Sequence, residues 1–430
     1  MIRIGFGQGF WGDSMEAPVR LVEDGPLDYL ALDYLAEVTM SILQKQKQEN
    51  PAFGYARDFP ALIERIAPTI KAKGIQILAN AGGVNPRACA QEILKRAPGL
   101  RVAVVEGDDI LALMAELVAG GEPFTNIDTR ESIHRVLPQL RSANVYLGAY
   151  PLAHALSLGA DVIVSGRCAD AALAMAPMVH RFHWEADDYN RLAAGAVAGH
   201  IVECGAQCTG GNCLADWRSI PDLAHIGYPI IEAEPSGDCV ITKHDLSGGR
   251  VSLASVKEQL VYEIGDPAQY YTPDVVADFT GVRLRADGEN RVHVAGAVGH
   301  GRPKQLKASI SYHWGWKASG TLVYSAPAGA EKARQAAAIV DERCADLGLR
   351  FESKLAEVFG EETAMLRMAV RAKERNVVDR WTREMIPLVL NGPPGATGYG
   401  DGRPKPSEVV AYWPALLPRD LVTPRVEILS

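Results

Sequence analysis

Ile75-Gln-Ile-Leu-Ala-Asn80 runs directly into Ala81-Gly-Gly-Val-Asn-Pro86, and this junction carries the clearest structural signal in the chain. A short aliphatic run that is bounded by turn residues is typical of a buried strand. Glycines at this density indicate a tight turn or a close approach of the backbone to another group. We therefore expect a strand over residues 75–80, a turn, and a helix over residues 87–95.

The same order of strand and helix recurs through the first half of the chain. We expect further strands over residues 2–5, 27–33, 101–106, 144–147 and 161–165, and helices over residues 34–48, 59–73, 108–117 and 168–179. Strands that alternate with helices of this length predict a mainly parallel sheet with helices on both faces, which makes the fold class α/β.

The pattern changes near Tyr228. Short β-branched or alternating segments follow at residues 239–242, 282–284, 291–295 and 305–312, and helical spacing returns over residues 331–347. This mixture is typical of an α+β arrangement. We therefore predict two domains, a Rossmann-like α/β domain over residues 1–227 and an α+β domain over residues 228–430.

Composition excludes several classes of protein. The chain has 430 residues, 47% of them hydrophobic, and a formal net charge of −8. No basic run is present, so we expect no nucleic-acid partner. No apolar run approaches the ~18 residues of a membrane span and no signal peptide is visible, so we expect a cytoplasmic protein without membrane contact. Seven cysteines in such a chain indicate reduced thiols.

Polar residues stand where predicted strands end, namely Asp33, Asn80, Glu106 and Arg167. In open α/β sheets, ligands bind outside the carboxyl ends of the strands. Helix capping would also explain Asp33 and Asn80. Arg167 suits a carboxylate or phosphate, which its planar guanidinium can grip at two points, although a structural Arg167–Asp170 pair is an equal alternative.

Potentially catalytic and ligand-binding residues are most concentrated between His200 and Cys213, in the stretch His-Ile-Val-Glu-Cys-Gly-Ala-Gln-Cys-Thr-Gly-Gly-Asn-Cys. Glu203 offers a general base, and Cys204 offers either a nucleophile or a buried apolar residue. We expect the loop that follows to contact a substrate through Thr209, Gly210, Gly211 and Asn212. The three cysteines lack the spacing of a zinc site and a matching second pair, so we predict no metal.

Lys243 and His244 follow another predicted strand. Lys243 could bind an anion and His244 could titrate near neutral pH. A polar turn before the next helix is the alternative interpretation.

Gly7-Gln-Gly9-Phe-Trp-Gly12 fits the G-x-G-x-x-G pattern between a strand and a helix, and Asp33 lies where a ribose-binding acid would stand. This pattern leaves open a dinucleotide-dependent oxidoreductase. Bulky Trp11 does not suit a tight pyrophosphate turn, and a turn that binds another anion or nothing is the alternative. The cofactor therefore stays unknown.

Several stretches together resemble the acyclic terpene utilisation family named for AtuA. They are Leu32-Asp-Tyr-Leu-Ala-Glu37, Asn80-Ala-Gly-Gly-Val-Asn85, Tyr146-Leu-Gly148, Gly166-Arg-Cys-Ala-Asp170, Glu203-Cys-Gly with Thr209-Gly-Gly211, Lys243-His244 with Gly248-Gly249, Gln259-Leu with Tyr262-Glu, and Asp266-Pro with Pro273-Asp. The resemblance implies a bacterial cytoplasmic protein that is often encoded near enzymes of acyl-CoA catabolism. It does not imply a particular set of catalytic residues.

We predict an enzyme of branched acyl-CoA, hydroxy-acid or unsaturated-acid catabolism, of lyase or hydratase type. The base would be Glu203 or Asp33, and Arg167 and Lys243 would hold the carbonyl or carboxylate, with Asp170 and His244 in the same site. The expected substrate contacts are Gly7, Gly9, Asn80, Gly82, Gly83, Asn85, Cys204 and the loop 209–212.

The expected partner is a small-molecule substrate, for which a CoA thioester is one candidate. We expect a homo-oligomer. Besides the oxidoreductase, a rival prediction is a non-catalytic large subunit that needs a small partner protein.

Overall fold

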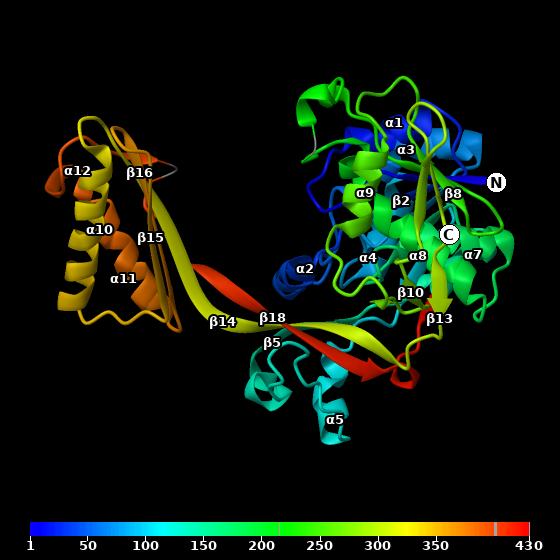
Figure 1. The fold of residues 1–430 in the computed structure, drawn as a ribbon. Coiled ribbons are helices and arrows are strands. Elements are labelled where there is room, and N and C mark those ends of the chain that lie inside the picture. Colours follow the sequence, from blue (N-terminus) through cyan, green and yellow to red (C-terminus); the bar gives the residue numbers. More distant parts are fainter. Residues whose placement is uncertain (215, 400–401, 430) are drawn as a thin grey trace. The chain divides into compact units, whose positions relative to one another are not determined.

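The computed structural model describes residues 1–214, 216–399 and 402–429 (Figure 1). Its contacts divide the chain into two compact units. Unit 1 comprises Met1–Ser311 and Tyr412–Ser430, and unit 2 comprises Tyr312–Ala411. The boundary predicted between residues 227 and 228 lies within unit 1, and the division into domains 1–227 and 228–430 stays a prediction.

Unit 1 is built on a ten-stranded sheet with the order β11-β12-β8-β7-β1-β2-β3-β6-β4-β19. Its centre is parallel and consists of β1 (Ile2–Phe6), β2 (Tyr29–Leu32), β3 (Gln76–Ala79), β6 (Val162–Ser165) and β4 (Val102–Glu106). This confirms the predicted α/β class. The remaining strands pair antiparallel and are β7 (Ile230–Ala233), β8 (Cys239–Thr242), β11 (Arg283–Ala286), β12 (Val292–Ala295) and β19 (Arg425–Leu429).

Alternation along each strand sends side chains into two separate cores. In β2, Tyr29 and Ala31 join one core, whereas Leu30 and Leu32 join the other. The first core is covered by α6 (Ala149–Ser157), α7 (Ala172–Phe182) and α8 (Tyr189–Val202). The second is covered by α1 (Glu16–Glu23), α3 (Phe59–Lys73) and α4 (Pro86–Arg96). A sheet buried on both faces explains why its strands are continuously apolar.

The change of pattern near Tyr228 corresponds to a change in strand direction within this same sheet. Five of the strands after that residue extend the sheet by antiparallel pairing, as β7 does on β1; they are β7, β8, β11, β12 and β19. One predicted strand lies elsewhere. β5 (Leu140–Val145) pairs with β14 (Gln305–Tyr324) instead of joining the parallel strands.

Unit 1 contains further helices and a second, small sheet. They are α2 (Glu37–Glu49), α5 (Met114–Ala119), α9 (Leu253–Val261), and a small antiparallel sheet of β13 (Val298–His300), β10 (Val276–Asp278) and β9 (Tyr270–Tyr271). Among the described residues, no helix is both long and apolar enough to cross a bilayer.

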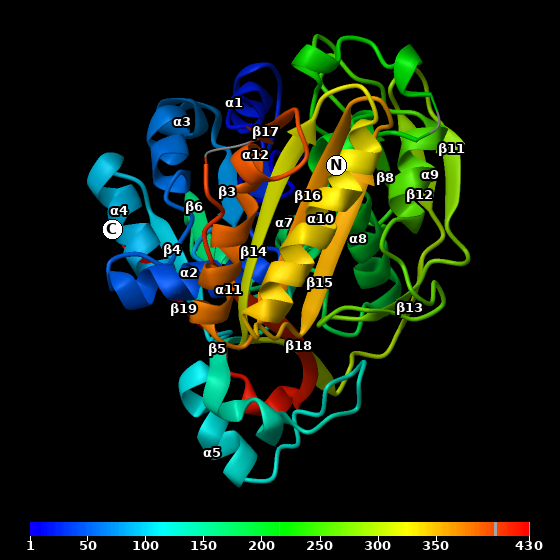
Figure 2. The same ribbon diagram turned by 90° about the vertical axis from the view of Figure 1, so that its left-hand side faces the viewer.

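Unit 2 is an antiparallel sheet with helices on one face. Its strands are β15 (Ser353–Phe359), β16 (Ala364–Ala372), β17 (Ala396–Tyr399) and the part of β14 beyond residue 311, with β18 (Ser407–Pro418) paired to β14. Figure 2 shows α10 (Gly329–Asp346) and α11 (Arg375–Met385) lying along this sheet, and α12 (Leu388–Asn391) follows α11. Leu366, Val340 and Trp381 fill the core between them.

Candidate functional site

Two cavities of unit 1 meet beside the carboxyl ends of β2 and β6. We call the first, of about 480 Å³, the loop cavity, because Gly9, Cys204, Gln207 and Asn212 line it. We call the second, of about 540 Å³, the tyrosine cavity, because Tyr146, Tyr270 and Tyr271 line it. Both cavities are lined by Glu37, Arg167, Asp170, Glu203 and Glu263. These shared residues form the candidate site.

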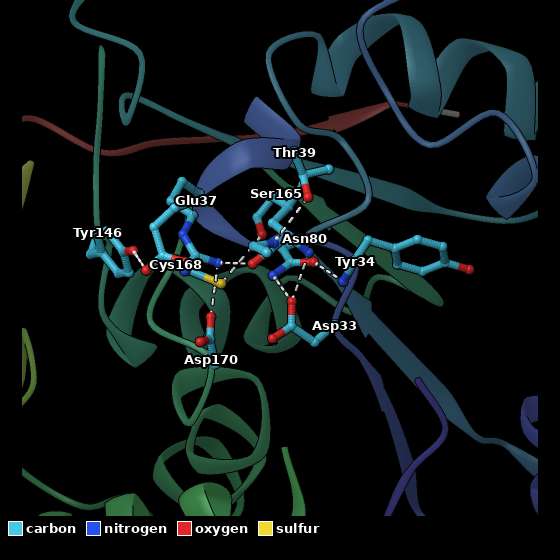
Figure 3. Close-up of polar contacts among 12 residues, drawn as sticks. Asp33, Tyr34, Glu37, Thr39, Asn80, Tyr146, Ser165, Cys168 and Asp170 are labelled. Atoms are coloured by element: carbon cyan, nitrogen blue, oxygen red, sulfur yellow. Dashed lines mark hydrogen bonds and ion pairs between the residues drawn. The ribbon is translucent and has the colours of Figure 1, made fainter. Parts of the chain in front are cut away.

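The side chains of Asp33 and Asn80 form a hydrogen bond at the point where β2 and β3 end. Asn80 Nδ2 donates to Asp33 Oδ1 at 2.6 Å, and Asn80 Oδ1 accepts from the backbone N–H of Tyr34 at 2.7 Å (Figure 3). The Leu35 N–H also donates to Asp33 Oδ1, at 2.9 Å. Both side chains are buried, and burial raises the pKa of Asp33 well above its usual value. Asp33 lines the loop cavity, but its contacts fix the backbone after β2.

Arg167 is a charged side chain that is almost fully buried, at 1% exposure. Its Nη1 donates to Asp170 Oδ1 at 2.8 Å and to the Leu35 carbonyl, so the predicted Arg167–Asp170 pair is present. The guanidinium carbon lies 4.3 Å from the centre of the Tyr146 ring. The Nε atom is buried and has no hydrogen-bond partner in the part of the chain that the structure describes. An unpartnered donor on a buried cation is suited to an oxygen atom of a ligand.

The backbone before Arg167 is held by a second carboxylate. The Arg167 N–H donates to Asp108 Oδ2 at 2.8 Å, and Asn144 Nδ2 donates to the same oxygen at 2.9 Å. A Cβ atom on Gly166 would lie 2.1 Å from Asp108 Oδ1. Glycine is therefore required here for the close approach that fixes Arg167.

Glu203 follows α8 and is held by a histidine one turn earlier. His200 Nδ1 lies 2.9 Å from Glu203 Oε1, and the Tyr270 hydroxyl lies 3.5 Å from the same nitrogen. Glu203 is only 14% exposed. Burial raises its pKa to about 7, although the contact with His200 opposes this shift. Glu203 Oε2 is buried and has no hydrogen-bond partner within the described chain, so no described protein group competes for a proton on this oxygen.

Cys204 is unsuited to act as a nucleophile. Burial, reinforced by the charge of Glu203, raises the pKa of its thiol to about 12. A thiol needs a lowered pKa to react as a thiolate near neutral pH. Cys208 and Cys213 are buried, and the described residues contain no group of three or more His, Cys, Asp or Glu side chains arranged to hold a metal ion.

The glycine pattern of residues 7–12 serves close packing. A Cβ atom on Gly9 would lie 3.0 Å from the carbonyl carbon of Cys204, and one on Gly7 would lie 2.9 Å from Leu32 Cδ2. The Gly9 N–H is already bound by the Asp13 carboxylate at 3.0 Å. The Asp13 carboxylate on this turn would repel a pyrophosphate. Asp33 is already bound to Asn80, so it is not placed to bind a ribose.

Two of the predicted site residues lie away from both cavities. Lys243 Nζ donates to the carbonyls of His244 and Ser247, at 3.3 and 2.6 Å. His244 Nε2 lies 3.0 Å from the Leu21 carbonyl, and burial lowers the pKa of this imidazole. These contacts favour the alternative interpretation, in which Lys243 and His244 belong to a polar turn and not to the candidate site.

Several predicted substrate contacts have structural partners instead. Asn85 Nδ2 donates to the carbonyls of Pro51 and Phe53, at 3.0 and 2.8 Å. The hydroxyl of Thr209 lies 2.5 Å from the Gly227 carbonyl. A Cβ atom on Gly82 would lie 2.6 Å from the Ser165 carbonyl oxygen. Gly83 and Gly210 have positive φ angles, of 53° and 103°. Only Gly211 and Asn212 of the predicted loop contacts line the loop cavity.

The structure adds site residues that the sequence did not reveal. Glu37 accepts from the Tyr146 hydroxyl at 3.0 Å and lies 3.7 Å from Lys307 Nζ. Although burial opposes it, the backbone, Arg167 and Lys307 hold the pKa of Glu37 below its usual value. Glu263 lines both cavities with a φ of 53°, a conformation that non-glycine residues rarely adopt. That strain is invisible in sequence.

Fold and site together define an α/β protein whose acid–base groups gather beside the carboxyl ends of its parallel strands. Residues 2–428 match the family model described as acyclic terpene utilisation family protein AtuA, and the chain belongs to this family. No curated protein and no solved structure matched the chain in the comparisons. Family membership supports a role in the catabolism of acyclic terpenes or of the acyl compounds derived from them.

Proposed function

We propose that this protein is a lyase or hydratase that acts by acid–base chemistry on a branched acyl substrate carrying a hydroxyl group or a double bond. One observation carries the proposal. Glu203 has a pKa of about 7 and an oxygen without a partner in the described chain, and it shares two cavities with the buried cation Arg167. A base whose pKa lies near the working pH is the most effective proton carrier.

Each residue has a distinct part in the proposed chemistry. The Nε–H of Arg167 donates to the carbonyl oxygen of the acyl group and stabilises the negative charge that develops there. Glu203 Oε2 removes a proton and later returns it. In a dehydration, the proton comes from the carbon next to the carbonyl and goes to the departing 3-hydroxyl group, which leaves as water while the double bond forms. In a carbon–carbon cleavage, the proton comes from the 3-hydroxyl group, the bond between carbons 2 and 3 breaks to give a new carbonyl group and an enolate, and the proton returns to carbon 2 of that enolate. His200 holds the other oxygen of Glu203 and so fixes the direction in which the free oxygen points.

The tyrosine cavity supplies an apolar surface for the rest of the substrate. Ile127, Leu306 and Leu416 line it together with Pro273 and Pro303. Burial of apolar surface contributes roughly 25 cal/mol for each Å² removed from water, so a branched hydrocarbon chain would bind here with useful affinity. The polar groups at the junction of the two cavities would then meet the acyl carbonyl.

Hydrogen exchange tests the proposal before the full reaction is known. Geranoyl and citronelloyl thioesters and their 3-hydroxy derivatives would be incubated with the protein in D₂O, and deuterium at the carbon beside the carbonyl would be measured by mass spectrometry. We expect exchange with the wild-type protein, and loss of exchange with Glu203→Gln. Exchange that persists unchanged in Glu203→Gln would contradict the proposal.

The rival functions differ in what they require. An oxidoreductase would show a thermal shift with NAD(P), because a ligand that binds the native state raises its apparent stability. A non-catalytic large subunit would be inactive until a partner protein is added. That the protein forms a homo-oligomer stays a prediction, which light scattering would check. That the substrate is a CoA thioester also stays a prediction.

A further inference from the structure

The carboxyl group of Asp33 has one oxygen without a partner among the described residues. Asn80 Nδ2 and the Leu35 N–H both donate to Oδ1, at 2.6 and 2.9 Å, whereas no described residue forms a hydrogen bond with Oδ2. In Figure 3, the dashed contacts of Asp33 accordingly end on a single oxygen. Asp33 is only 4% exposed and lines the loop cavity, so Oδ2 is the oxygen that remains for a ligand in this cavity.

No described cation forms an ion pair with this carboxyl group. Arg167 faces Asp33, but its Nη1 donates to Asp170 Oδ1 at 2.8 Å instead. Burial and the charge of Asp170 raise the pKa of Asp33, and the charge of Arg167 opposes the shift only in part. Two thiols, Cys168 and Cys204, also face Asp33, and burial raises the pKa of both. A buried carboxyl group without a bound cation takes up a proton instead of staying charged.

The hydrogen bonds of Asp33 decide which oxygen carries the proton. Oδ1 already accepts two N–H groups, and a proton on this oxygen would displace one of them. Asn80 is itself held by the Tyr34 N–H, which donates to Asn80 Oδ1 at 2.7 Å. A protonated carboxyl group has a single O–H donor. Neutral Asp33 therefore presents an O–H group on Oδ2, with its direction fixed by Asn80.

A second donor belongs to the same cavity. Arg167 lines the loop cavity, and its buried Nε has no hydrogen-bond partner in the described part of the chain. A carbonyl oxygen has two lone pairs and accepts two hydrogen bonds. Donors that are already in place where negative charge develops stabilise that charge, and a carboxyl group kept neutral by burial is an effective donor of this kind.

We propose that Asp33 is a neutral catalytic residue whose Oδ2–H donates a hydrogen bond to the carbonyl oxygen of the substrate, beside the Nε–H of Arg167. The proton stays on Asp33 throughout the reaction, so no bond of Asp33 forms or breaks. The hydrogen bond strengthens as the oxygen gains charge in the enolate. A neutral Asp33 is not a base, so this role replaces one alternative that the sequence leaves open. The inference rests on the proposed function, because it adds a second contact to the same carbonyl group.

Infrared spectroscopy tests the protonation state without turnover. Carboxylic acids and carboxylates absorb in separate regions, so the difference spectrum between the wild type and Asp33→Asn isolates this one group. We expect Asp33→Asn to remove a carboxylic acid band at neutral pH. The control Asp346→Asn changes an exposed aspartate and should remove a carboxylate band. Loss of a carboxylate band in Asp33→Asn as well would overturn the inference.

The nitro analogue of citronellic acid tests the contact with a ligand. A nitro group replaces the carboxyl group in this compound, and its nitronate anion resembles an enolate. We expect the acid band of Asp33 in the wild-type protein to move to lower frequency when the nitronate binds, because a hydrogen bond to an anion weakens the bonds of the acid. A band that does not move would show a purely structural Asp33 and would overturn the inference.

The affinity for the same nitronate separates the O–H donor from the rest of the side chain. Asp33→Asn keeps an acceptor for Asn80 and places an amide N–H where the O–H stood, so we expect its affinity to stay within about threefold of the wild type. Asp33→Ala has no donor and should bind at least about tenfold more weakly, a difference of about 1.4 kcal/mol. Melting temperatures would show that both variants are folded. Wild-type affinity in Asp33→Ala, or a tenfold loss in Asp33→Asn, would contradict the proposed contact.

The two proposals fail in different ways. If Glu203→Gln keeps hydrogen exchange while the acid band of Asp33 still responds to the nitronate, the role of Glu203 is wrong and the contact of Asp33 stands. If exchange requires Glu203 but Asp33 is ionised or its band does not move, the contact of Asp33 is wrong and the role of Glu203 stands.

Discussion

His200 Nδ1 lies 2.9 Å from Glu203 Oε1, and this contact leaves the second oxygen of Glu203 without a partner among the described residues. The two residues are three positions apart at the end of α8, so the same helical turn presents both. His200 itself packs against both Tyr270 and Phe279, with ring centres 5.2 and 5.6 Å away. Glu203 therefore has a fixed orientation as well as a raised pKa.

Glu203→Gln should lower turnover by roughly 10²–10⁴-fold, because the amide cannot carry the proton. Cys204→Ser should keep most of the activity, since its thiol stays protonated near neutral pH. Turnover and melting temperature would be measured for both variants. An inactive Cys204→Ser beside an active Glu203→Gln would mean that the thiol performs the chemistry.

Activity should rise with pH to a plateau above about pH 7 if Glu203 acts as the base. The carboxylate form is needed, and burial keeps this carboxyl protonated below that pH. The same limb should disappear from the kcat/KM profile of any residual activity in Glu203→Gln. A wild-type profile that is flat from pH 5 to pH 8 would contradict this assignment.

Stability should depend on pH in the opposite direction. The native pKa of Glu203 is about 7 against a usual value of 4.5, so between these values the unfolded state loses its proton first. The free energy of unfolding should therefore fall as pH rises from about 4.5 to 7, by roughly 1–3 kcal/mol. Urea unfolding of the wild type and of Glu203→Gln would be compared at both ends, and the glutamine variant should lack this contribution.

Arg167→Lys should lower activity by roughly 10²-fold, because lysine keeps the charge but loses the planar set of donors that reaches Asp170, the Leu35 carbonyl and a substrate oxygen. Added guanidinium ion should partly restore activity to Arg167→Ala, which a merely misfolded variant would not show. Wild-type activity in Arg167→Lys would rule out the proposed contact with the substrate.

Asn80→Ala should reduce the free energy of unfolding by roughly 2–4 kcal/mol, because it leaves Asp33 Oδ1 and the Tyr34 N–H without their buried partner. Asn376→Ala on the exposed start of α11 should cost well under half as much. Urea unfolding measures both variants. If both variants lost the same free energy of unfolding, the Asp33–Asn80 hydrogen bond would not stabilise the fold more than an exposed contact does.

The sequence alone predicted the α/β class and the five strands of the parallel centre, because apolar runs and turn residues act over a few neighbouring positions. Phe59–Lys73 is helical over the predicted range. The carboxyl-end rule pointed to Asp33, Asn80, Glu106 and Arg167. Asp33 and Arg167 line the loop cavity together with Glu203, whereas Asn80 and Glu106 do not line it. Residues that follow parallel strands share an edge of the sheet wherever the strands lie in the sequence.

Only the tertiary structure decided which distant groups complete the site. β5 looked like another parallel strand, but its partner β14 follows more than a hundred residues later. Tyr270 and Lys307 line the tyrosine cavity and come from different strands, β9 and β14. Lys243 and His244 lie elsewhere, where their side chains contact backbone carbonyls. Burial raises the pKa of Glu203, and burial depends on the packing of α8 against segments far away in the chain. Local patterns fix the elements, whereas long-range packing sets their neighbours and so their chemistry.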